Sequence, residues 1–166
     1  MLKFQIEQIA LFPGLGTNKA FLLLKDLGLD DWVYDTVTAA GQVFGSDGKN
    51  EADLAFNYQS GSDKPLELEV LHYSKGHNWM DESIAKGTVS GVGAVSHLGM
   101  HVTREQLDEF AAVMQKHGIR IAQEVFTNGH TNPAIKDSRR YNYVIYDTRK
   151  ILGVDLKFIV RLPYPA

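Results

Sequence analysis

The sequence predicts an α+β protein that is built from two similar halves. Each half has the pattern of a strand, a helix and then three strands, and the two halves align at a spacing of about 89 positions. The alignment places polar residues of the two halves opposite one another: Gln8 with His97, Glu67 with Asp155, and Glu69 with Lys157. Because these polar residues interrupt apolar strands, we expect the duplication to build one shared site.

The first half begins with a strand predicted over residues 2–12, which ends at Pro13. Thr17 or Asn18 is suited to cap the helix that follows, and Gly28 is suited to end that helix in the left-handed conformation. Strands and turns then follow in alternation: strands around residues 32–43, 53–58 and 66–72, with turns at 45–48 and 60–63.

The second half repeats this order with a stronger helix signal. Thr103 and Gln106 have the spacing of a capping box, and apolar residues then recur at helical intervals until Gly118. Strands are predicted over residues 119–126, 141–146 and 153–161. The segment between the halves, residues 74–93, is too apolar at Trp79 and Met80 for a flexible tether. We therefore expect one domain over residues 1–166, with a first unit over about 1–75 and a second over about 93–162.

Composition narrows the possible functions of the chain. It has 166 residues, a net charge of -3 and no run of like charges, which argues against nucleic acid or a membrane surface as partner. The absence of cysteine excludes disulfides and thiolate metal ligands. No apolar run approaches the roughly 20 residues that span a bilayer, so we expect a cytoplasmic location.

The chain resembles the glyoxalase, bleomycin-resistance and extradiol-dioxygenase superfamily, also called vicinal oxygen chelate proteins. The resemblance rests on the paired βαβββ units, on the segment Ser96-His97-Leu98-Gly99-Met100-His101-Val102, and on Tyr146-Asp147-Thr148 ahead of the last strand. It implies two βαβββ units that form an open, barrel-like mixed sheet around a central cleft. It also implies a divalent metal in that cleft and leaves a homodimer open.

The metal ligands of that superfamily come from the first and last strands of each unit. The corresponding positions here are Gln8, Glu69, His97 and Lys157. The first three match the Gln, Glu, His, Glu set of eukaryotic-type glyoxalase I, whereas a protonated lysine cannot coordinate a cation and repels it. Asp155 is therefore an alternative fourth ligand. A mixed set of oxygen and imidazole donors suits Zn, Mn, Fe, Ni or Co better than Ca.

Several alternatives remain for these residues. Lys157 is suited to an ion pair with Glu69 across the cleft, to contact with a substrate anion, or to the role of a general base, and we favour the first two. Glu67 points to the same side as Glu69 and is the alternative ligand from that strand, and both glutamates would also fit a solvated strand face. His97 would also fit a hydrogen-bonded residue of the core.

Substrate contacts are expected from a loop of about fourteen residues, 127–140, because loops of this length in compact domains are usually functional or disordered. His130, Asn132, Arg139 and Arg140 would hold an anionic substrate from there, and an ordinary exposed connection is the alternative. His101 lies about 13 Å along the strand from His97. It is therefore assigned to the substrate and not to the metal. Lys157 and His130 are the candidate catalytic groups.

Two functions follow from these expectations. One is a metal-dependent lyase, isomerase or dioxygenase that acts on a small oxygen-bearing molecule chelated at the metal. The alternative is a metal-free protein of the bleomycin-resistance type that binds a small molecule or drug. His97 with Glu69 favours the first function, and Lys157 favours the second.

Overall fold

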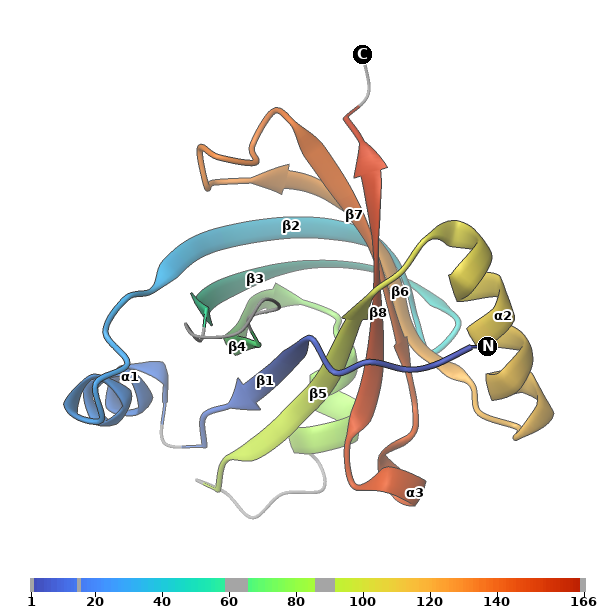
Figure 1. Cartoon of the computed structure of the whole chain (residues 1–166), viewed down its shortest axis with the longest axis horizontal. Helices are drawn as coiled ribbons and strands as arrows, with labels where there is room; N and C mark the ends of the chain where they lie inside the picture. Colours follow the sequence, from blue (N-terminus) through green and yellow to red (C-terminus); the bar gives the residue numbers. More distant parts are fainter. Residues whose placement is uncertain (1, 15, 59–65, 86–91, 165–166) are drawn as a thin grey trace.

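Eight strands from both halves form one mixed sheet that closes on itself (Figure 1). The computed structural model describes residues 2–14, 16–58, 66–85 and 92–164. The strands are β1 (Gln8–Phe12), β2 (Val33–Val43), β3 (Ser46–Tyr58), β4 (Glu67–Gly76), β5 (Ala94–His101), β6 (Ile121–His130), β7 (Arg139–Tyr146) and β8 (Asp155–Pro163). Their order around the sheet is β1-β4-β3-β2-β6-β7-β8-β5, which confirms the predicted α+β fold of two βαβββ units.

The two halves are joined twice, by antiparallel pairing of β1 with β5 and of β2 with β6. These two pairings, the seams between the halves, close the sheet into a barrel. The resemblance had implied an open sheet. The registers repeat between halves: Gln8 lies beside Glu67 in the parallel β1–β4 pair, and His97 lies beside Asp155 in the parallel β5–β8 pair. The aligned polar residues therefore occupy equivalent places in the barrel.

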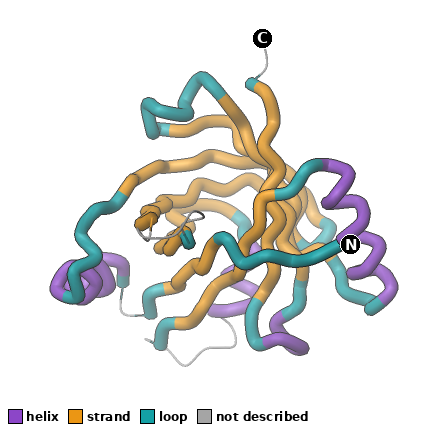
Figure 2. Tube along the Cα trace, in the orientation of Figure 1, coloured by secondary structure: helices purple, strands orange, loops and turns teal. Residues whose placement is uncertain are grey.

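The helices lie outside the strands (Figure 2). They are α1 (Thr17–Asp26), α2 (Arg104–Lys116) and α3 (Arg149–Leu152), with a π-helical turn at Asp81–Ala85. The predicted capping box at Thr103 and Gln106 is confirmed, and α2 buries Leu107, Phe110 and Met114. Within the described residues, no helix combines the length and apolar character that crossing a membrane requires.

The first helix differs from α2 in its cap and in its packing. Gly16 occupies the N-cap position of α1 without a side-chain hydrogen bond, so the expected cap by Thr17 or Asn18 is not made. Gly28 has the predicted positive φ, 86°. Because α1 buries none of its residues, tertiary packing stabilises it less than it stabilises α2.

Two predicted connections are shorter in the structure. The β2–β3 hairpin turns at Phe44 and Gly45, which have φ values of 47° and 79°, so β3 begins at Ser46 and not at residue 53. The expected fourteen-residue loop is also wrong, because β6 continues to His130 and β7 begins at Arg139. Only residues 131–138 connect these strands. The predicted turn at 60–63 lies outside the described residues.

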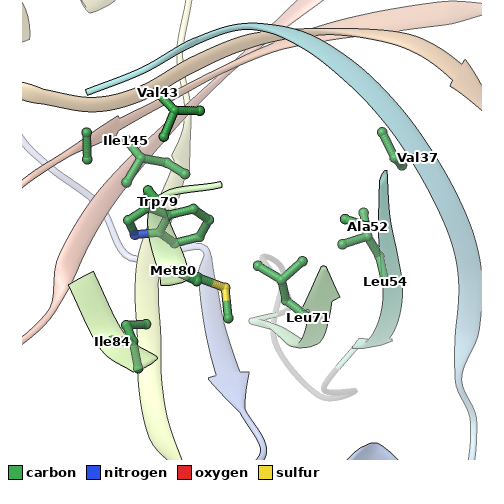
Figure 3. Packing of buried hydrophobic residues seen from close by; sticks show 10 residues of the cluster. Val37, Val43, Ala52, Leu54, Leu71, Trp79, Met80, Ile84 and Ile145 are labelled. Atoms are coloured by element: carbon green, nitrogen blue, oxygen red, sulfur yellow. The ribbon is translucent and has the colours of Figure 1, made fainter. Parts of the chain in front are cut away.

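The segment between the halves fills one end of the barrel. Trp79 has no exposed surface, and its indole Nε1 donates a hydrogen bond to Asp155 at 3.2 Å. Its ring lies 5.7 Å from that of Tyr73 in an edge-on arrangement. Figure 3 shows Trp79, Met80 and Ile84 among strand residues that include Val43, Leu71 and Ile145. This packing explains why the segment is apolar and leaves the opposite end of the barrel as the accessible one.

Candidate functional site

Four polar side chains meet inside the barrel, one from each of β1, β4, β5 and β8: Gln8, Glu69, His97 and Lys157. His97 Nε2 lies 2.8 Å from Gln8 Oε1 and 3.0 Å from Glu69 Oε2. Lys157 Nζ lies 3.3 Å from Gln8 Oε1 and 3.7 Å from Glu69 Oε2. All four are buried, and Lys157 has the largest exposure at 5%. The predicted convergence of Gln8, Glu69 and His97 is confirmed, and we call these four residues the polar cluster.

Gln8 connects the members of the polar cluster. Its Oε1 accepts hydrogen bonds from His97 and Lys157, and its Nε2 donates one to Glu67. Gly99, which pairs with Gln8 across the β1–β5 seam, leaves the space for this amide. A Cβ atom at position 99 would lie only 2.8 Å from Gln8 Oε1. Gly99 is therefore part of the site, although a glycine in a strand gives no such signal in the sequence.

His97 is a neutral imidazole in this setting. Its Nε2 faces two acceptor oxygens and therefore carries the ring proton, whereas Nδ1 accepts a hydrogen bond from Ser96 Oγ at 2.9 Å. Burial, reinforced by the charge of Lys157, lowers the pKa of His97 to about 4. The ring donates to the oxygens of the polar cluster, and its lone pair points away from them.

Glu69 and Lys157 form a buried ion pair, as one of the alternatives for Lys157 anticipated. Burial alone would raise the pKa of Glu69, but the charge of Lys157 and the contact with His97 outweigh burial and lower it. Neither carboxylate oxygen has a hydrogen bond of good geometry, although His97 Nε2 is 3.0 Å from Oε2. The negative charge of Glu69 therefore depends on the nearby ammonium.

A cavity of about 220 Å³ lies over the polar cluster. Lys157 and Glu67 reach it from the cluster side, and Asn132 and Arg139 line it near the 131–138 connection. Burial, together with the charge of Glu69, raises the pKa of Glu67. Glu67 is half-buried, so it is the carboxyl group of the cluster region best placed to exchange a proton with a molecule in the cavity.

Along one wall of the cavity, two tyrosine rings and two cationic side chains from β7 and β8 lie in a row. Lys157 Nζ lies 4.5 Å from the centre of the Tyr143 ring, and Tyr143 stacks on Tyr141 with centroids 5.6 Å apart. The Arg139 guanidinium lies 5.8 Å from the centre of the Tyr141 ring. Both cations gain from the ring faces. The alternation of Arg139, Tyr141 and Tyr143 on one face of β7 was visible in the sequence. The sequence did not indicate that Lys157, from β8, lies over the Tyr143 ring at the end of this row.

The structure does not bring Asp155 to the polar cluster. Its carboxylate accepts hydrogen bonds from the backbone and guanidinium of Arg149, both at 3.1 Å, and from Trp79. Asp155 is thus engaged at the closed end of the barrel and is not in place as a fourth ligand. Trp79 also lies at this closed end.

The other predicted residues fall into two groups. Asn132 and Arg139 line the cavity, as does His101, whose imidazole lies 3.0 Å from Glu7 at the surface. His130 and Arg140 do not line it. His130 is buried against Asp35, with Nδ1 2.7 Å from Oδ2, and Arg140 Nε donates to the carbonyl of Thr127 at 2.7 Å.

The arrangement does not fit a resident divalent metal. His97 Nε2, the nitrogen that faces the other donors, carries a proton, and the Lys157 ammonium lies beside the same two oxygens that a cation would use. Across the described part of the chain, no group of three or more His, Asp or Glu side chains is arranged to hold a metal ion. The positive charge that balances Glu69 comes from the protein itself.

Comparison with known proteins supports the fold. The sequence matches no family model and no curated protein. A methylmalonyl-CoA epimerase from Streptomyces coelicolor, in complex with 2-nitronate-propionyl-CoA, superposes with a TM-score of 0.50 over 98% of this chain and 97% of that chain, at 12% identity. A second methylmalonyl-CoA epimerase gives a TM-score of 0.46 over 97% and 95% of the two chains, also at 12% identity. A glyoxalase family protein from Bacillus cereus gives 0.26 over 98% and 95%, at 17% identity. The Streptomyces coelicolor structure supports the fold of two βαβββ units in this chain.

Replacing Lys157 with methionine should destabilise the protein by about 3–5 kcal/mol at neutral pH, because it leaves Glu69 buried without a compensating charge. With Lys157 present, the pKa of Glu69 lies below its ordinary value of 4.5, so its contribution to stability is present above that pH and is lost as pH falls through the lowered pKa. Without Lys157, burial raises this pKa, and stability is instead lost as pH rises through the raised value. The difference between the two proteins should therefore shrink as pH falls below the raised pKa of Glu69 in the variant, and it should be smallest below the lowered pKa of Glu69 in the wild type.

Urea unfolding at several pH values measures this difference. The double variant Lys157→Met/Glu69→Met is the matched control and should recover much of the loss at neutral pH, since it removes both charges together. A loss for Lys157→Met that is the same at every pH would contradict the ion pair.

The His97 ring should stay neutral from pH 8 down to about pH 5, since its pKa is lowered to about 4 from the ordinary value of 6.5. Between pH 4 and pH 6.5, His97 is protonated in the unfolded chain and neutral in the folded chain. The contribution of His97 to stability is therefore complete above about pH 6.5 and is lost as pH falls toward 4. Imidazole nitrogen chemical shifts measured by NMR report the ring's charge and tautomer directly. Titration of His97 near pH 6.5, or a proton on Nδ1 in place of Nε2, is the contrary result.

Proposed function

We propose that this protein binds a small oxygen-bearing organic molecule in the cavity over the polar cluster, without a resident metal. The observation that carries the proposal is the position of the Lys157 ammonium, 3.3 Å from Gln8 Oε1 and 3.7 Å from Glu69 Oε2. This ammonium supplies the positive charge that a metal would supply in the superfamily that the chain resembles. Because Lys157 also lines the cavity, it can donate a hydrogen bond to an oxygen of the bound molecule.

The surroundings of the cavity support binding of an organic molecule. About half of its lining is apolar or aromatic, and the rest is polar or charged, a combination that can bury an organic body and orient its polar groups. The polar cluster forms a rigid base, since His97 and Glu69 have no exposed surface and each contacts at least two other polar groups. A ligand oxygen would therefore meet a preorganised donor, which reduces the cost of ordering the site on binding.

Glu67 favours a second candidate function, proton transfer of the isomerase or lyase type. Its carboxyl group lines the cavity, and burial raises its pKa toward the range in which a carboxylate accepts a proton effectively. For a bound carbonyl compound, a proton would pass from the carbon beside the carbonyl to Glu67. The negative charge that develops on the carbonyl oxygen would be stabilised by Lys157.

The binding proposal is tested with a panel of oxygen-bearing small molecules: acids, ketones, phenols and thioesters. Affinities are measured by calorimetry on folded protein. Compounds that bind should lose about tenfold or more in affinity in Lys157→Met, because a hydrogen bond from a charged donor is removed. The exposed Lys136, on the 131–138 connection, provides the control variant Lys136→Met, which should bind as the wild type does.

Metal analysis of the same preparations distinguishes the metal-free proposal from a metal-dependent function. After dialysis against a chelator, we expect the wild type to hold no stoichiometric divalent ion and Lys157→Glu to bind Mn, Zn or Ni. The substitution adds a carboxylate to Gln8, Glu69 and His97 and removes the repelling ammonium. Lys136→Glu controls for the change in net charge. A full equivalent of metal retained by the wild type would overturn the metal-free proposal.

Proton transfer is tested by following exchange of carbon-bound hydrogen in D2O for the carbonyl compounds that bind. Glu67→Gln should slow exchange by about 100-fold or more, the usual contribution of a general base, while changing affinity little. Exchange that is equally fast in Glu67→Gln and in the wild type would assign the protein to binding alone.

A further inference from the structure

We infer that the cavity selects organic acids, in which Arg139 anchors a carboxylate at the mouth and a second oxygen of the ligand reaches Lys157 at the floor. This inference rests on the proposed binding function and names its ligand class. Three observations support it: the Arg139 Nε has no hydrogen bond, two tyrosines separate Arg139 from Lys157, and apolar side chains form much of the remaining lining.

Among the described residues, the Arg139 guanidinium lies over the Tyr141 ring but beside no carboxylate. Its Nε is buried and has no hydrogen bond, and within the described chain its guanidinium makes no ion pair. Two other arginines, by contrast, have polar partners. Arg140 donates to a backbone carbonyl at 2.7 Å, and Arg149 is paired with Asp155 at 3.1 Å. An unsatisfied buried donor is costly, and a guanidinium is best satisfied by two parallel bonds to a carboxylate.

The wall of tyrosines sets the spacing between the two cations. Arg139 and Tyr143 are four residues apart on β7, about 13 Å along the strand, and Lys157 lies over Tyr143. Tyr141 is packed between Arg139 and Tyr143, while Tyr143 is packed between Tyr141 and Lys157. Because these ring faces are occupied, a ligand meets the edges and hydroxyl groups of the tyrosines.

The three carboxyl groups of the lining already have partners within the protein. Asp35 accepts hydrogen bonds from the backbone of Thr131 and Asn132 and pairs with His130. Glu69 is paired with Lys157, and Glu67 accepts a hydrogen bond from Gln8. Arg139 thus leaves the mouth with positive charge that a ligand can neutralise.

The rest of the lining determines which chemical group fits between the two polar ends of the ligand. The apolar side chains Val33, Leu54, Phe56 and Ile159 line the cavity together with the tyrosines. They favour an apolar body between the two polar ends, because burying it removes apolar surface from water. The ligand class is therefore a carboxylate with a short aliphatic or aromatic body and a second oxygen at the far end.

Three related probes test this inference: 4-hydroxybenzoate, 4-hydroxybenzamide and benzoate. The first has both ends, the second lacks the negative charge, and the third lacks the far oxygen. We expect the wild type to bind 4-hydroxybenzoate about tenfold or more tightly than 4-hydroxybenzamide, the effect of a charge-assisted contact. Arg139→Gln should reduce 4-hydroxybenzoate binding by a similar factor and leave 4-hydroxybenzamide binding unchanged. Lys136→Gln, with the same change in net charge, should alter neither.

Benzoate tests the other end of the ligand. The preference for 4-hydroxybenzoate over benzoate should be lost in Lys157→Met and retained in Arg139→Gln. Equal binding of 4-hydroxybenzoate and 4-hydroxybenzamide by the wild type would overturn the role of Arg139 while leaving the binding function intact. If neutral compounds of the wider panel bind in a Lys157-dependent manner and no acid does, the ligand class is wrong and the proposed function stands. If no compound of either panel binds, the proposed function itself fails.

Discussion

The buried charge of Glu69 is the constraint on which the rest of the site depends. A carboxylate with no exposed surface must either take up a proton or lie beside a positive charge, because the loss of hydration is otherwise too costly. Here Lys157 provides that charge from the strand at the other side of the polar cluster. The ion pair links β4 of the first half to β8 of the second, so the two halves share one electrostatic centre.

The other members of the polar cluster adjust to this ion pair. His97 is neutral because it is buried and because Lys157 repels a second positive charge next to it. It can then donate through Nε2, and Gln8 must present its oxygen to both His97 and Lys157. The amide nitrogen of Gln8 is thereby directed to Glu67, whose pKa is raised. One charge pair thus determines the tautomer of a histidine and the orientation of an amide.

The barrel separates this centre from solvent at one end and opens it at the other. Trp79 and its neighbours in the segment between the halves occupy the closed end, where Asp155 is held by Arg149 and Trp79. The opposite end has the cavity, with Arg139 at its mouth and Lys157 at its floor. A ligand in this cavity meets the polar cluster along a wall that carries a cation at each end and two tyrosines between them.

The sequence by itself determined the two βαβββ units, the capping of α2 and the convergence of Gln8, Glu69 and His97, because these follow from periodicity and from a repeat at constant spacing. It could not decide between Lys157 and Asp155, since both point to the same side of β8 and differ only in the partners that other segments bring: Glu69 for Lys157, Arg149 and Trp79 for Asp155. The length of the 127–140 connection was likewise decided by pairing of β6 with β2 and by the hydrogen bonds of Asp35, which are about 95 residues distant in sequence. Closure of the sheet depends on strands from both halves. Local pattern specifies which residues face inward, and only the tertiary structure specifies what each of them meets there.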